Sequence, residues 1–159
     1  MANRPEYQSP ESAETQELLF RVGMIGDSRE PRRSNPLSDP PAFRELAARL
    51  AGMVDVEYDL IVVRNLFGDK VLGYQLSLIS GKPTAVSFDR EGVIVLDPAV
   101  ELTGGSRTLL VADIHFTPHN IRAASSGIEK AGLNIAGLGL LMQAREDNYL
   151  FPVWSLSFR

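Results

Sequence analysis

The sequence has no cysteine, only two histidines among its 159 residues, and no long apolar run. The missing cysteines exclude disulfide bonds and thiolate metal sites, and they fit the cytoplasmic localisation that we expect. No apolar stretch approaches the roughly 20 residues that cross a bilayer, so we expect no membrane partner. The amino terminus has early prolines and acids in place of an apolar core, which predicts that it is not a signal peptide.

Basic residues are also scarce. Sixteen Lys and Arg against 20 Asp and Glu give a formal net charge of −4, whereas a nucleic-acid-binding face needs an excess of positive charge. Neither a Gly-x-Ser-x-Gly turn nor a Gly-x-x-x-x-Gly-Lys-Ser/Thr loop occurs, which excludes those nucleophile and phosphate motifs. The length suits one domain, with a flexible tail expected over 1–13 and the domain over 14–159.

The centre of the chain has the pattern of a β-α-β unit. An apolar run over 109–112 predicts a strand that is buried on both faces, and this strand ends at Asp113. A polar loop follows, in which Asn120 is the expected N-cap of a helix. A second apolar run over 134–142 completes the unit. The loop therefore lies at the carboxyl end of a parallel strand, where open α/β sheets bind ligands.

The flanking segments continue this alternation of strands and helices. We expect an α/β fold with a mostly parallel central sheet flanked by helices, in which 59–63, 83–88, 108–115 and 134–142 share one sheet. Three further helices are expected: one over 14–22, one capped by Asp39, and one that ends at Gly81 and has Leu72, Leu76 and Ile79 on one stripe. We also expect a hairpin arm over 91–98 and a last strand over 148–158.

Residues 109–121 (Leu-Leu-Val-Ala-Asp-Ile-His-Phe-Thr-Pro-His-Asn-Ile) resemble the signature of the type I phosphoribosyltransferases, and the order of elements is similar to that of their orotate branch. In that family, two adjacent acids hold the ribose hydroxyls of phosphoribosyl pyrophosphate, and a Thr- and Gly-rich loop wraps its 5-phosphate. Asp113 matches the first acid and Thr117 the first loop threonine. Ile114 stands in place of the second acid, and bulkier residues replace the loop glycine.

The resemblance implies a set of site residues and partners. It implies catalytic roles for Asp113 and Arg90. It also implies that Thr117, His119 and Asn120 bind the 5-phosphate and that Arg64 and Lys70 bind the pyrophosphate. An active protein would use magnesium with a phosphorylated ribose or nucleotide ligand. The orotate branch also implies a homodimer, and the apolar run over 93–96 needs cover.

Each candidate residue also has a purely structural interpretation. Asp113 could satisfy backbone amides, and Arg64 and Lys70 could be solvated surface side chains. His115 and His119 could join Asp113 in a metal site, but core packing is the favoured interpretation of His115, and we predict no metal site.

The altered motif predicts a phosphoribosyltransferase-like protein with weak or no phosphoribosyl transfer. The alternatives are an active, divergent transferase and a protein that binds a nucleotide or a protein partner without catalysis. If the fold is otherwise intact, restoring the motif by Ile114→Asp together with Pro118→Thr and His119→Gly should raise the affinity for phosphoribosyl pyrophosphate.

Overall fold

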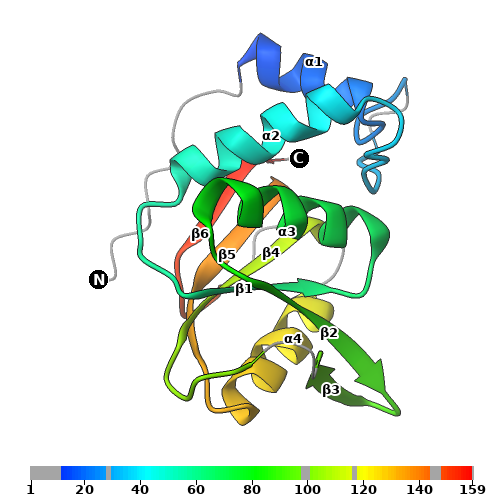
Figure 1. Ribbon diagram of the computed structural model, residues 1–159. Coiled ribbons are helices and arrows are strands. Elements are labelled where there is room, and N and C mark those ends of the chain that lie inside the picture. The colour runs from blue at the N-terminus through cyan, green and yellow to red at the C-terminus, as the bar shows by residue number, and fades with distance from the viewer. Residues whose placement is uncertain (1–11, 28–29, 98–100, 116–117, 144–147, 159) are drawn as a thin grey trace.

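The computed structural model describes residues 12–27, 30–97, 101–115, 118–143 and 148–158. Within these residues, one sheet of six strands is flanked by four helices (Figure 1). The strands are β1 (Leu60–Arg64), β2 (Thr84–Arg90), β3 (Val93–Leu96), β4 (Arg107–His115), β5 (Asn134–Gln143) and β6 (Val153–Phe158). The helices are α1 (Ala13–Arg21), α2 (Pro40–Met53), α3 (Phe67–Ser80) and α4 (Pro118–Lys130).

The strand order is β3-β2-β1-β4-β5-β6. All neighbouring strands are parallel except β3, which pairs antiparallel with β2. The predicted α/β fold, the common sheet of the four expected strands and the hairpin arm are therefore confirmed. From β1 the chain passes through α3 to β2, and from β4 it passes through α4 to β5, so the two units run outward in opposite directions from the β1–β4 pair.

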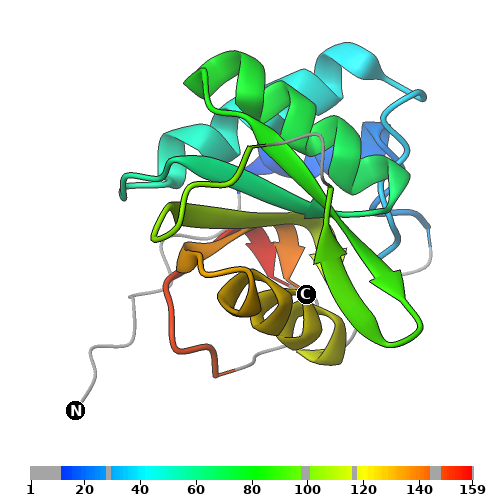
Figure 2. The same cartoon turned by 60° about the horizontal axis from the view of Figure 1, so that its bottom comes forward.

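The helices lie on both faces of the sheet, with α1, α2 and α3 on one side and α4 on the other (Figures 1 and 2). Strand β4 shows how the sequence supports this arrangement. Leu109 and Val111 belong to the apolar cluster under α1–α3, whereas Leu110 and Ala112 belong to the cluster under α4. Because successive strand residues point to opposite faces, a strand covered on both sides must be apolar at every position, as this run is.

Local signals set several helix ends as expected. Asp39 caps α2 by accepting a hydrogen bond from the Ala42 amide at 3.1 Å, and Gly81 ends α3 in the left-handed region with a φ of 73°. All three residues predicted to align lie on α3, but only Leu72 and Leu76 are buried, because Ile79 is 50% exposed.

Other boundaries differ from the predictions. Helix α4 begins at Pro118 and not after Asn120, because a proline fits the first turn of a helix, where its missing amide costs no hydrogen bond. Strand β6 covers only the second half of the expected 148–158 segment. The predicted tail lies outside the described residues except for Ser12 and Ala13, which cap and begin α1. None of the helices in the described ranges has the length and apolar character needed to span a bilayer.

Candidate functional site

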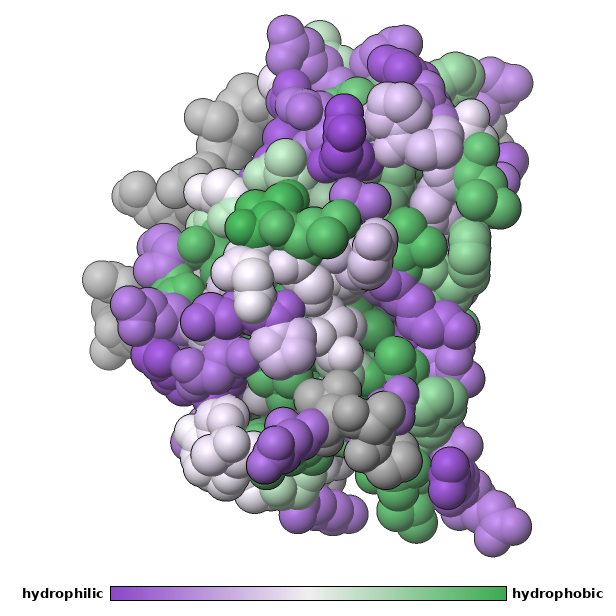
Figure 3. All heavy atoms as spheres, viewed as in Figure 1, coloured by the Kyte–Doolittle hydropathy of each residue, from purple (hydrophilic) through white to green (hydrophobic). Residues whose placement is uncertain are grey.

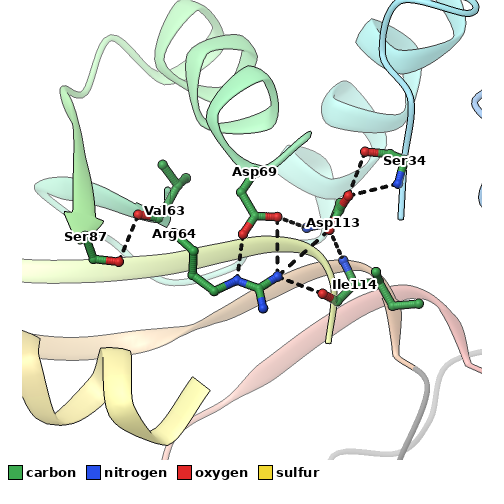
Figure 4. Close-up of polar contacts among 7 residues, drawn as sticks. All are labelled: Ser34, Val63, Arg64, Asp69, Ser87, Asp113 and Ile114. Atoms are coloured by element: carbon green, nitrogen blue, oxygen red, sulfur yellow. Dashed lines mark hydrogen bonds and ion pairs between the residues drawn. The ribbon is translucent and has the colours of Figure 1, made fainter. Parts of the chain in front are cut away.

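The candidate site lies where the carboxyl ends of β1 and β4 meet. These strands are hydrogen-bonded neighbours, with Val63 opposite Val111, and the chain leaves them toward α3 on one face and α4 on the other. This is the switch point of the sheet, at which open α/β folds form a crevice for ligands. The segment before α2 also reaches this point and contributes Ser34 (Figure 4).

Arg64 is the last residue of β1, and two nitrogens of its guanidinium bond to groups inside the protein (Figure 4). Its Nε donates to Asp69 Oδ2 at 2.7 Å, and its Nη2 donates to the Ile114 carbonyl at 2.7 Å. The same Nη2 lies 3.9 Å from Asp113 Oδ1. Arg64 is only 8% exposed, so its interpretation as a solvated surface residue is wrong. It sits on a central strand, and the first turn of α3 returns Asp69 to pair with it.

Asp113 is held by donors from three directions (Figure 4). Its Oδ2 accepts hydrogen bonds from the Ser34 amide at 2.9 Å and from the Ser34 hydroxyl at 2.7 Å. Its Oδ1 accepts from the Ile114 amide at 2.6 Å and faces Arg64. The residue is 2% exposed, so its carboxylate is directed at the chain itself and away from solvent.

Asp69 completes the cluster from the first turn of α3. Its Oδ1 accepts a hydrogen bond from the Asp113 amide at 2.9 Å, and its side chain is fully buried. Burial raises the pKa of Asp69 to about 7, and the negative charge of Asp113 adds to this rise while Arg64 opposes it. Two buried carboxylates face one guanidinium, and the cluster therefore binds a proton near neutral pH.

The other candidate residues do not join this cluster. Lys70 is exposed and donates to Asn65 Oδ1 at 3.1 Å. Arg90 lies at the exposed turn between β2 and β3, which projects away from α3 (Figure 1). Asn120 is exposed in the first turn of α4. Thr117 lies outside the described residues, and for His115 and His119 the structure gives only their places at the end of β4 and the start of α4.

Among the described residues, the side chains at this site do not form a set that would hold a metal ion. No group of three or more His, Asp or Glu side chains converges among the residues that the structure describes. The two carboxylates that do come together, Asp69 and Asp113, already accept hydrogen bonds from Arg64, from Ser34 and from backbone amides.

Two residues of the cluster, Asp69 and Ser34, were not among the sequence candidates. A sequence signal for Asp69 exists. It stands five residues after Arg64 in the first turn of a helix, where the positive end of the helix dipole stabilises a carboxylate. Ser34 is 79 residues from Asp113 in an aperiodic segment, and no local pattern indicates their contact.

The structure argues against repairing the motif at Ile114. Its side chain is fully buried in the apolar cluster under α1–α3. An aspartate at this position would place an uncompensated charge among aliphatic side chains, which is strongly unfavourable. Ile114→Asp alone should therefore destabilise the fold, and the gain in affinity expected from the combined change at 114, 118 and 119 stays a prediction.

No protein-family model matches the chain. Among curated proteins, it is 28% identical over 99 residues to an orotate phosphoribosyltransferase from Pelotomaculum thermopropionicum, an alignment that covers 62% of this chain. The chain spans only half the length of that relative.

Two solved structures show the fold. Adenine phosphoribosyltransferase from Thermoanaerobacter pseudethanolicus superposes with a TM-score of 0.71 at 18% identity, covering 91% of this chain and 99% of that protein. Orotate phosphoribosyltransferase from Aeropyrum pernix superposes with a TM-score of 0.68 at 14% identity, covering 89% of this chain and 92% of that one.

Proposed function

We propose that this chain, which has the type I phosphoribosyltransferase fold, is an orotate-type phosphoribosyltransferase-like protein with weak or no phosphoribosyl transfer. One observation carries the proposal. The carboxylate of Asp113, which the resemblance assigns to the ribose hydroxyls, is bonded on both oxygens to donors of its own chain.

The pyrophosphate side of the site supports the same conclusion. Arg64, which the resemblance places beside the pyrophosphate, is hydrogen-bonded to Asp69 and buried under α3. A pyrophosphate would have to approach a cluster that already holds two carboxylates. Lys70 is the candidate cation that stays exposed there, and an exposed lysine is a flexible point charge that binds phosphate without fixed geometry.

The phosphate side has lost donors as well. Pro118 has no amide hydrogen, and the sequence offers His119 where the family has a glycine that lets the backbone approach phosphate. Each lost charge-assisted contact costs about 1.5 to 3 kcal/mol, so the loss of a few weakens binding by several powers of ten.

The test is a calorimetric titration of the whole chain with phosphoribosyl pyrophosphate, with and without magnesium, beside an assay of orotate phosphoribosyl transfer. We expect no saturation at micromolar ligand and no transfer above background. Asp113→Asn is the matched variant, and it should change the weak binding only slightly, because the ligand reaches this carboxylate only when its internal hydrogen bonds break. Micromolar, magnesium-dependent binding that Asp113→Asn abolishes would overturn the proposal and assign the chain to the active transferases.

A second candidate function is the binding of a nucleotide without catalysis. It is supported by a solved hypothetical protein from Neisseria gonorrhoeae with bound ppGpp, which superposes on 75% of this chain with a TM-score of 0.57 at 15% identity. The same titration with ppGpp separates the two candidates, since saturable binding of ppGpp without binding of phosphoribosyl pyrophosphate favours the second.

A further inference from the structure

We propose that the segment 30–38, here named the strap, is an intramolecular competitor of ribose at Asp113. Ser34 occupies the place that a sugar diol would take, and a ligand can reach the carboxylate only when the strap leaves. The inference rests on the proposed role of Asp113 as the ribose acid.

The contact has the chemistry of a bound diol. A vicinal diol presents two hydroxyl donors, carried on adjacent carbons, to a carboxylate. Ser34 likewise presents two neighbouring donors, its amide and its hydroxyl, and both reach Asp113 Oδ2, at 2.9 and 2.7 Å. Hydrogen bonds to an ionised acceptor are stronger than neutral ones, so the strap satisfies Asp113 well.

The strap is the partner of Asp113 that can move most easily. Arg64, Asp69 and Ile114 lie in the sheet or in the first turn of α3, and all three are buried. The strap has no helix or strand, and most of its side chains are exposed. Its remaining anchors include backbone hydrogen bonds to the end of α1 and the turn after it, from Arg32 to the Met24 carbonyl and from Asn35 to the Val22 carbonyl.

The strap also fits tightly against the start of α3. A Cβ added at Gly68 would come within 2.6 Å of Asp113 Oδ2 and closer still to Ser34 Oγ. Ser34, Asp113 and the α3 backbone therefore close the crevice together, and no sugar ring fits between them while Ser34 is in place.

The experiment compares the binding of two probes, ribose 5-phosphate and 2-deoxyribose 5-phosphate, to the unmodified chain and to Ser34→Ala. The variant loses one of the two donors that compete for Asp113, so we expect it to bind ribose 5-phosphate about tenfold more tightly. The deoxy sugar has no vicinal diol and should gain little. Ser80→Ala, at the far end of α3, is the matched control and should bind like the unmodified chain.

Limited trypsin digestion measures strap opening directly, because the bond after Arg33 lies in the strap. Cleavage at this bond should be faster in Ser34→Ala, and saturating ribose 5-phosphate should accelerate it in the unmodified chain. The proposal would be overturned if Ser34→Ala and the unmodified chain bound ribose 5-phosphate with equal affinity, or if neither bound it. An equal gain for the deoxy sugar would also overturn it. Tight binding of phosphoribosyl pyrophosphate by the unmodified chain would instead overturn the proposed function, so the two failures are distinguishable.

Discussion

At the scale of single residues, the main feature is a buried cluster with more negative than positive groups. Asp69 and Asp113 are both buried, and Arg64 is the cation that faces them. Breaking a buried ion pair by removing one partner typically costs about 3–5 kcal/mol, because the other charge is left in a low-dielectric environment. In this cluster, Asp69→Asn should cost less free energy of unfolding than that, because Arg64 still has Asp113 as a partner at 3.9 Å.

The raised pKa of Asp69 predicts how stability depends on pH. The unfolded chain releases this proton near the ordinary value of 3.8, whereas the folded chain holds it up to about 7. Between these values the folded state binds more protons than the unfolded state. The free energy of unfolding from this group should therefore fall as pH rises from about 4 to 7 and level off above 7.

Urea unfolding at several pH values between 4.5 and 7.5 measures this slope. Asp69→Asn, which mimics the protonated side chain, should flatten the slope and be closest to the unmodified chain at the acidic end. The exposed Asp89→Asn is the control and should keep the slope. A slope that survives in Asp69→Asn would show that this carboxyl is not the titrating group.

At the scale of elements, the start of α3 is the piece that closes the site. Gly68 stands in its first turn, and the absence of a side chain lets α3 approach Asp113 and the strap together. Gly68 thus serves the packing of the chain against itself, in the segment that the resemblance assigns to the pyrophosphate loop.

Gly68→Ala should therefore destabilise the fold by overpacking. The expected loss is about 1–3 kcal/mol in the free energy of unfolding, because Ser34 or α3 must shift to admit the methyl group. Gly52→Ala in α2 is the matched control, since nothing lies within 4 Å of its added Cβ. Gly52 lies in the last turn of α2, so this change should stabilise by less than the roughly 0.5–1 kcal/mol that it gives in a helix interior. Equal effects of the two substitutions in urea unfolding would contradict this account of α3.

At the scale of the whole molecule, apolar side chains gather on the outer face of α3 (Figure 3). Phe67, Tyr74, Leu78 and Ile79 are each at least half exposed, and together they form the α3 patch. The sequence predicts that the apolar run over 93–96 needs cover. This run is partly covered within the chain, because Ile94 packs closely against Gly127 of α4. Of the 93–96 run only Val93 is exposed, so we expect the four exposed side chains of α3 to be the surface that a partner covers.

The predicted homodimer therefore stays a prediction, now with the α3 patch as its expected contact. Sedimentation at concentrations on the order of tens of micromolar should show a dimer, because the dissociation constant of an apolar dimer interface lies below this concentration. Leu78→Lys should shift the chain to monomer by placing a charge in the contact. Phe20→Lys, at a similarly exposed position on α1, should not. A monomeric unmodified chain, or dimers that tolerate Leu78→Lys, would count against this arrangement.

The sequence by itself determined the layered α/β fold and most of its elements. The apolar run that forms β4 and the caps Asp39 and Gly81 act on neighbouring residues, so their signals can be read in short windows. The family resemblance likewise placed Asp113 near the carboxyl end of the correct strand, which continues to His115.

Only the tertiary structure decided what happens at that strand end. Arg64 and Asp69 became a buried pair because α3 folds back over β1, and Ser34 reached Asp113 across 79 residues of chain. Such contacts depend on how elements pack and leave no periodic trace in the sequence. A carboxylate that looked available for a ligand was thus satisfied by the chain itself, since a buried charge must find its partners within the fold.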